Sequence, residues 1–136
     1  LKINNLKGNL LANFHYGSYL AYKLYPDNFI FMDGRYEETY DPELLTHMAF
    51  IFVGPNWKEK LNEQQVDYIL TEKSYLIYDR LLKDEDWKLA TDSEYFALFV
   101  KKNIDIKKLK MPPKDIGYYN KTKWQTNIDW STGWIK

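Results

Sequence analysis

Short apolar segments with helical and strand-like patterns alternate along the chain, and this alternation constrains the fold more than any other feature. Tyr16, Leu20 and Leu24 recur at helical spacing, and Pro26 ends that pattern. Residues 29–32 are then continuously apolar and are bounded by Asp-Asn and Asp-Gly. A continuous apolar run indicates a strand that is covered on both faces, as in a parallel sheet.

The rest of the chain continues this alternation into the order β-α-β-α-α-β-α-β-β, which begins with a short apolar strand at residues 8–13. Asp41-Pro42-Glu43 predicts a helix start, because Asp serves as the N-cap and Pro fits the first turn. This helix should end near Val53. The elements expected after it are a short helix that begins with the capping pair Asn56 and Glu59, a strand at 66–71, a helix capped by Ser74, and a hairpin of strands at 87–91 and 95–100.

Alternating strands and helices predict an α/β fold with three layers, a mostly parallel mixed sheet and a C-terminal antiparallel hairpin. Residues 1–102 should form this domain. Residues 103–136 are lysine-rich and then polar with spaced aromatic residues, so we expect an extended tail that packs on the domain. Trp124, Trp130 and Trp134 should anchor the tail; the alternative is that they stack on sugar rings or lie at a membrane boundary.

Composition bounds the class of protein. The 136 residues suit one domain, and the absence of cysteine excludes disulfides and thiolate metal sites. The 19 basic and 19 acidic residues argue against a nucleic-acid partner, which normally requires a basic surface. No apolar run approaches the ~20 residues that span a bilayer. Because there is no signal peptide and residue 1 is Leu, we expect a part excised from a longer protein.

The densest polar cluster, Asp33, Arg35, Glu37 and Glu38, directly follows the strand predicted at residues 29–32. Open α/β sheets bind ligands at the carboxyl ends of their strands. The planar guanidinium of Arg35 suits a phosphate or carboxylate, and Asp33 suits a hydroxyl or a metal ion. The alternative is structural: Asp33 caps the turn, Gly34 supplies a positive φ, and Arg35 pairs with a nearby acid.

The two histidines and the remaining motifs add little catalytic chemistry. His15 precedes a helix next to Tyr16, where it would either help to start the helix or hydrogen-bond a substrate, whereas His47 should be packed in mid-helix. A nucleophile elbow, a phosphate loop and a dinucleotide-binding glycine motif are all missing from the sequence. We therefore expect no cofactor, no metal and no catalytic residue. The predicted binding residues are His15, Tyr16, Asp33, Arg35, Glu37 and Glu38.

Two motifs in the first third of the chain resemble a pattern found in a family of bacterial polytopic membrane proteins. The first, at residues 13–20, is similar to N-x-x-x-G-G-Y-L, with Ser18 in place of the second glycine. The second, at residues 31–35 and followed by Tyr40, is similar to V-F-I-D-G-R and a tyrosine. Matches at 66–70, Leu81, Trp87 and 96–99 extend the resemblance over about residues 8–101.

This family resembles the C-type glycosyltransferases, in which many transmembrane helices are followed by a soluble extracytoplasmic domain. The catalytic subunit of oligosaccharyltransferase has a similar layout, and there a Trp-Trp-Asp-Tyr-Gly motif helps to bind the acceptor peptide. Residues 13–17 stand at that position, but His15 replaces the acid, so the resemblance does not extend to recognition of a peptide acceptor. The resemblance implies that the catalytic carboxylates lie on loops of the membrane part.

We therefore expect a soluble domain of a membrane glycosyltransferase-like protein, on the extracytoplasmic face of the bacterial cell membrane. It would assist the binding of an acceptor or of a lipid-linked donor, without catalysis of its own. Its expected partners are the transmembrane part of the same polypeptide and a lipid-linked sugar or glycan. The alternative is a non-catalytic module for glycan or protein binding or for assembly; a free-standing small α/β enzyme is disfavoured by the missing motifs.

The purified domain should therefore transfer and hydrolyse no glycosyl groups. Assays with sugar-phosphate and glycoside substrates test this expectation. Turnover that a single substitution within the domain abolishes would contradict it, because such a result would place catalytic residues in this chain.

Overall fold

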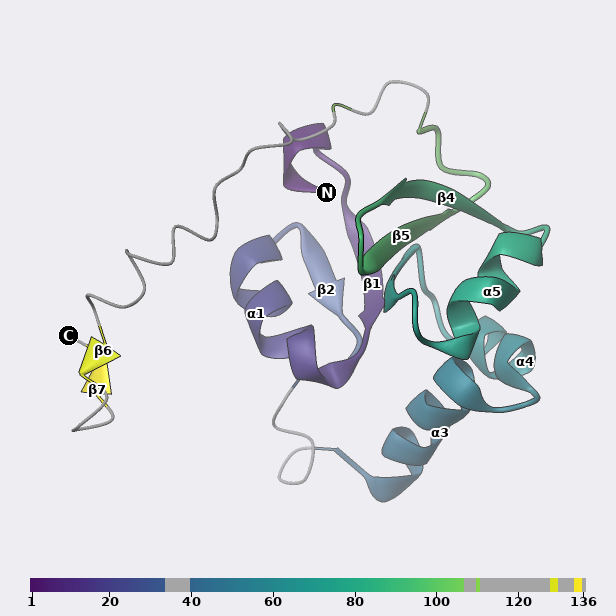
Figure 1. The fold of residues 1–136 in the computed structure, drawn as a ribbon, viewed down its shortest axis with the longest axis horizontal. Coiled ribbons are helices and arrows are strands. Elements are labelled where there is room, and N and C mark those ends of the chain that lie inside the picture. The colour runs from purple at the N-terminus through teal and green to yellow at the C-terminus, as the bar shows by residue number, and fades with distance from the viewer. Residues whose placement is uncertain (34–39, 107–109, 111–127, 130–133, 136) are drawn as a thin grey trace.

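The structure is a computed structural model that describes residues 1–33, 40–106, 110, 128–129 and 134–135. The described residues form a five-stranded mixed sheet in the order β2-β1-β3-β5-β4 (Figure 1). Its strands are β1 (Gly8–Ala12), β2 (Asn28–Ile30), β3 (Tyr68–Glu72), β4 (Trp87–Asp92) and β5 (Phe96–Lys101). Its helices are α1 (Phe14–Leu24), α3 (Pro42–Val53), α4 (Trp57–Asn62) and α5 (Leu76–Lys83), preceded by the short 3₁₀ helix η1 (Lys2–Asn4).

The sheet confirms the predicted α/β class. β1 pairs in parallel with both β2 and β3, whereas β5 runs antiparallel to β3 and β4. Four strands therefore point in one direction and only β5 opposes them, which makes the sheet mostly parallel. β4 and β5 form the predicted hairpin at the end of the domain.

The predicted environment of the second strand is wrong. β2 has only three residues and lies at the edge of the sheet, with Phe29 66% exposed. The apolar run at residues 29–32 has another cause: Ile30 packs into one core cluster, and Phe31 and the buried Met32, which follow the strand, pack into the other. Continuous hydrophobicity here reflects a segment that serves two clusters rather than a central strand.

Two of the three predicted N-caps, Asp41 and Asn56, stand at the predicted positions, but only Asp41 makes a capping hydrogen bond with its side chain. Asp41 accepts a hydrogen bond from the Glu43 N–H at 2.8 Å, and α3 ends before Gly54 as expected. Asn56 precedes α4 but makes no side-chain capping bond, and the N-cap of α5 is Tyr75. Ser74 does not cap because its hydroxyl donates to the Glu72 carboxylate at 3.3 Å instead.

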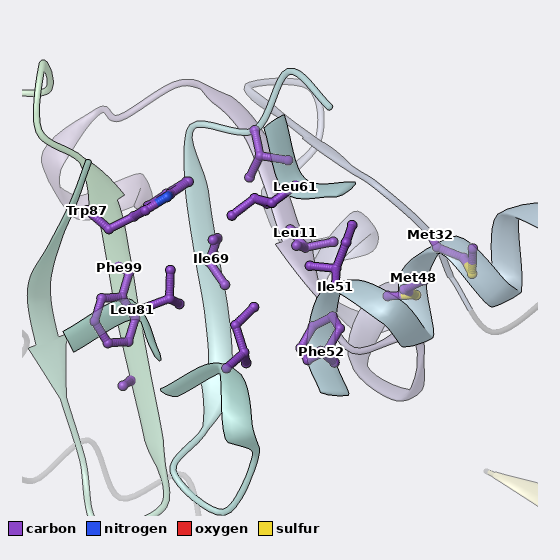
Figure 2. Close-up of a cluster of buried hydrophobic side chains, with 13 residues drawn as sticks. Leu11, Met32, Met48, Ile51, Phe52, Leu61, Ile69, Leu81, Trp87 and Phe99 are labelled. Carbon is purple, nitrogen blue, oxygen red and sulfur yellow. The ribbon is translucent and has the colours of Figure 1, made fainter. Parts of the chain in front are cut away.

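Two core clusters lie on opposite faces of the sheet, because successive residues of a strand point to opposite sides. Leu11, Ile69 and Phe99 join α3, α4 and α5 in the larger cluster (Figure 2). The residues next to them on the other face join Leu20 and Leu24 of α1 in the second cluster; they are Leu10, Tyr68, Leu70, Leu98 and Val100. The predicted three-layer packing itself stays a prediction.

Gly17 allows α1 to lie directly on the chain that follows β2. A Cβ at this position would collide with the carbonyl oxygen of Met32 and would lie 2.5 Å from the Asp33 Cα. These are backbone atoms, which cannot move aside as a flexible side chain would. Only glycine therefore permits this approach, which holds the start of α1 beside the end of the β2 segment.

The start of the predicted tail lies against the domain. Ile104 and Ile106 pack on the second core cluster, and the Asn4 side chain binds both backbone groups of Lys110, at 3.0 and 2.6 Å. Further on, β6 (Ile128–Asp129) pairs antiparallel with β7 (Trp134–Ile135). Trp124 and Trp130 lie outside the described residues, so the domain boundary at residue 102 and the packing of the tail stay predictions.

Replacing Gly17 with alanine should destabilise the domain. The change gains up to ~1 kcal/mol of helix propensity, but overpacking against backbone should cost more, so we expect a net loss of at least ~1 kcal/mol. Urea denaturation measures the difference. Tyr22→Ala, at a position that is 79% exposed on the same helix, is the control and should change stability by no more than ~0.5 kcal/mol. A Gly17→Ala domain as stable as wild type would show that α1 does not make this contact.

Candidate functional site

The adjacent strands β1 and β3 form the topological switch point of the sheet. From the end of β1 the chain enters α1, whose residues Leu20 and Leu24 pack on one face. From the end of β3 it enters α5, whose residues Ile77 and Leu81 pack on the other face. Figure 1 shows α1 beside β2, and α3, α4 and α5 together at the other side of β1. Chains that leave neighbouring strands in opposite directions open a crevice, where sheets of this kind bind ligands.

A cavity of about 360 Å³ lies at this switch point. Asn13 and Phe14 form its wall on the β1 side, Tyr75 forms it on the β3 side, and one face of α3 completes it. We call it the switch-point pocket; its lining residues are Asn13, Phe14, Leu45, Met48, Ala49, Phe52, Val53 and Tyr75. None of these eight side chains carries a formal charge. The wall therefore suits an uncharged, mainly apolar group.

A group of hydrogen-bonding side chains joins the ends of β1 and β3; two of them, Asn13 and Tyr75, also line the pocket. The Tyr16 hydroxyl donates to Glu72 Oε1 at 2.7 Å, and the Ser74 hydroxyl donates to Glu72 Oε2 at 3.3 Å. The Asn13 amide donates to the Tyr75 hydroxyl at 3.2 Å. We call these five residues the polar rim. Together they present a carboxylate, two phenols, an amide and a hydroxyl at the ends of β1 and β3, and the amide of Asn13 and the phenol of Tyr75 lie at the wall of the apolar cavity.

Local structure fixes the hydrogen bond between Asn13 and Tyr75. Asn13 is the N-cap of α1 and accepts a hydrogen bond from the His15 N–H at 3.1 Å, which leaves its amide nitrogen directed to Tyr75. The Tyr75 ring packs edge-on against Phe52 of α3, with 5.8 Å between the ring centroids. The Asn13 amide therefore has one fixed orientation, with its oxygen on the helix and its nitrogen at the rim.

The hydrogen bond to Glu72, with some burial and the charge of the same carboxylate, raises the pKa of Tyr16 to about 12. Its ring also packs edge-on against Phe96, with 5.4 Å between the centroids. Tyr16 is therefore a neutral donor, held in place over the sheet. Its proton keeps the carboxylate of Glu72 oriented at the rim.

The structure places the predicted binding residues in different surroundings. Tyr16 belongs to the polar rim. His15 is exposed, its ring lies 4.0 Å from that of Phe14, and its backbone N–H is used in the helix cap. Asp33 is partly buried after β2, next to Gly17. The other three predicted binding residues lie outside the described part of the chain; they are Arg35, Glu37 and Glu38. The predicted turn residue Gly34 also lies outside it.

Sequence reasoning missed most of the polar rim. Glu72 is the last residue of β3, and Ser74 and Tyr75 come directly after it, so the rule that pointed to Asp33 after β2 could have pointed to them as well. The wall of the pocket was harder to recognise. Leu45, Met48 and Phe52 have the spacing of an ordinary core-facing helix stripe, and nothing in that pattern marks a cavity.

His47 links two helices and lies away from the pocket. Its Nε2 lies 3.0 Å from the carbonyl oxygen of Lys60, and its Nδ1 lies 3.6 Å from a carboxylate oxygen of Glu63. These contacts join α3 to α4, as expected of a packed histidine. Within the described residues, no group of three or more His, Asp or Glu side chains is placed to hold a metal ion. Among the described helices, none combines the length and the apolar character needed to cross a membrane.

No model of a known family, no curated protein and no solved structure matches the chain.

The hydrogen bond between Tyr16 and Glu72 predicts a pH dependence of stability. A tyrosine whose pKa rises from 10.0 to about 12 on folding stabilises the protein below pH 10, and this contribution is lost as the pH rises toward 12. Tyr16→Phe removes the titrating group, so its stability in urea should fall less over that interval than the stability of wild type does. Tyr22→Phe, which removes a phenol that is 79% exposed, is the control and should follow wild type. Equal losses in wild type and Tyr16→Phe would contradict the hydrogen bond.

Proposed function

We propose that this chain is an accessory ligand-binding domain of a bacterial polytopic membrane glycosyltransferase-like protein. On the extracytoplasmic face of the membrane it would help to bind an acceptor or a lipid-linked donor at the switch-point pocket. The chemistry would belong to the transmembrane part of the same polypeptide. The observation that supports the proposal is an uncharged, mainly apolar cavity whose wall includes two residues of the polar rim, Asn13 and Tyr75. The sequence resemblance supplies the link to glycosyl transfer.

The pocket favours a ligand with two chemically different parts. Its apolar wall can remove an alkyl or prenyl chain from water, at a gain of ~0.8 kcal/mol for each buried methylene. Its volume of about 360 Å³ lies within the usual ~300–1,000 Å³ of small-molecule sites. A chain-bearing molecule therefore fits better than a free polar metabolite.

Asn13 and Tyr75, the two residues of the polar rim that line the pocket, favour a neutral sugar at its mouth. The Asn13 amide can donate a hydrogen bond to a sugar hydroxyl, and the Tyr75 phenol can donate or accept one. The Glu72 carboxylate, which accepts from Ser74 next to Tyr75, would accept a hydrogen bond from a hydroxyl farther along the sugar. The negative charge of Glu72 disfavours a phosphate at the same position. In a lipid-linked sugar the sugar would therefore lie at the rim, and its phosphate farther from the carboxylate.

A second candidate function is protein binding or assembly at the same place. The exposed fractions of Phe50, Val53 and Leu76, near the pocket on α3 and α5, are 41%, 50% and 55%. Exposed apolar side chains around a cavity also suit a protein surface. A partner protein would have to cover these three residues, whereas a small amphiphile would only need the pocket.

Monomeric n-octyl β-glucoside, below its critical micelle concentration, tests the proposal because it carries both parts of the expected ligand. Wild type should bind it more tightly than it binds glucose, as measured by NMR titration. Ala49→Trp should fill the pocket and weaken binding tenfold or more, that is by ~1.4 kcal/mol. Ala49 is exposed at the pocket wall, so this variant should stay folded.

Thr46→Trp is the matched control, since it adds the same indole to an exposed position of α3 that does not line the pocket. It should bind the glucoside as wild type does. No binding by wild type, or the same loss in both tryptophan variants, would refute the pocket as the ligand site.

A further inference from the structure

Exposed tyrosines lie on the outer side of α1 and at Tyr25, the residue directly after the helix. Tyr19, Tyr22 and Tyr25 are 57%, 79% and 71% exposed, although each ring could bury a large apolar area. Leu20 and Leu24 of the same helix pack on the sheet instead. We call Tyr19, Tyr22, Lys23 and Tyr25 the tyrosine surface. It is formed by a helix whose inner side is already occupied.

Lys23 lies among these rings. Its Nζ is 5.7 Å from the ring centroid of Tyr19 and 5.4 Å from that of Tyr22, within the range of cation–π contacts. The tyrosine surface thus offers amphipathic rings and one cation side by side. The switch-point pocket is lined by other residues, so the tyrosine surface is separate from it.

Helix α1 is positively charged, whereas the chain as a whole has a net charge of +0. Its one lysine is Lys23, and the next charged residue along the chain is Asp27. Lys7 pairs with Asp27 at 2.8 Å. Helix α1 contains no acidic residue at all. Lys23 is therefore the charge that the tyrosine surface presents, and it is complementary to an anionic partner.

We propose that the tyrosine surface docks on the headgroup layer of an anionic lipid bilayer. Tyrosine is enriched at the boundary between membrane and water, because its ring is apolar and its hydroxyl remains hydrated. Lysine side chains near the surface are attracted to anionic lipids. A negatively charged membrane surface matches a helix face of this composition. The proposal concerns a different surface from the switch-point pocket and does not depend on the ligand of that pocket.

Tyr95 provides an internal comparison. It is 66% exposed at the turn between β4 and β5, but its neighbours Asp92 and Glu94 are acidic. If exposed tyrosine alone were enough, Tyr95 would contribute to membrane binding as much as the tyrosines of α1. If the combination with positive charge is required, Tyr95 should contribute nothing.

Co-sedimentation with lipid vesicles tests the proposal. Wild type should bind vesicles of equimolar phosphatidylglycerol and phosphatidylcholine at least tenfold better than vesicles of phosphatidylcholine alone, and added salt should weaken the binding. Tyr19→Ser/Tyr22→Ser and Lys23→Gln should each reduce binding at least threefold. Tyr95→Ser, the matched control, should bind as wild type does. Circular dichroism confirms the fold of each variant, and Lys23→Gln remains informative if the double variant unfolds.

Three results would overturn the proposal. The first is the absence of binding by wild type to the anionic vesicles. The second is an equal loss of binding in Tyr95→Ser and in the variants of the tyrosine surface. The third is a wild-type dimer in light scattering that the double variant abolishes while vesicle binding is unchanged, which would assign the tyrosine surface to a second copy of this chain.

Discussion

The close contact between α1 and the backbone after β2 is the constraint on which the rest of the structure depends. It exists because residue 17 is glycine: any side chain would collide with Met32 and Asp33. With α1 held there, its first turn lies over the ends of β1 and β3, so that Asn13 reaches Tyr75 and Tyr16 reaches Glu72. One close helix contact thus positions both links of the polar rim.

Local sequence signals predicted the elements whose cause is local. Asp41 and Pro42 define the start of α3 through their own hydrogen bond and backbone geometry, and the hairpin of β4 and β5 follows from two apolar runs and a short turn. Local sequence signals failed where contacts between distant parts of the chain determine the environment of a residue. The apolar run that includes Phe29 belongs to an edge strand because the sheet order places β2 outermost, and Ser74 donates to Glu72 instead of capping α5.

The candidate site shows the same division. Tyr16 could be proposed from the sequence, because it lies near a helix start that follows a strand. Its partner Glu72 is 56 residues away, and the pairing depends on β1 and β3 being neighbours, which no local pattern specifies. The pocket depends on α3 leaving a gap above Phe14 and Tyr75. A helix stripe that seals the core and one that leaves a cavity have the same spacing, so the wall could not be told from ordinary core.

The central claim is that the switch-point pocket binds the apolar part of a sugar-bearing ligand. The most direct measurement is NMR of ¹³C-methyl methionine during titration with monomeric n-octyl β-glucoside. Met48 lines the pocket, whereas Met32 is fully buried in the same core cluster and does not line it. The proposed site predicts that the Met48 methyl signal shifts with saturation and shows intermolecular contacts to the octyl chain, while the Met32 signal stays in place. An unchanged Met48 signal, or equal shifts of both methionines without contacts to the chain, would contradict it.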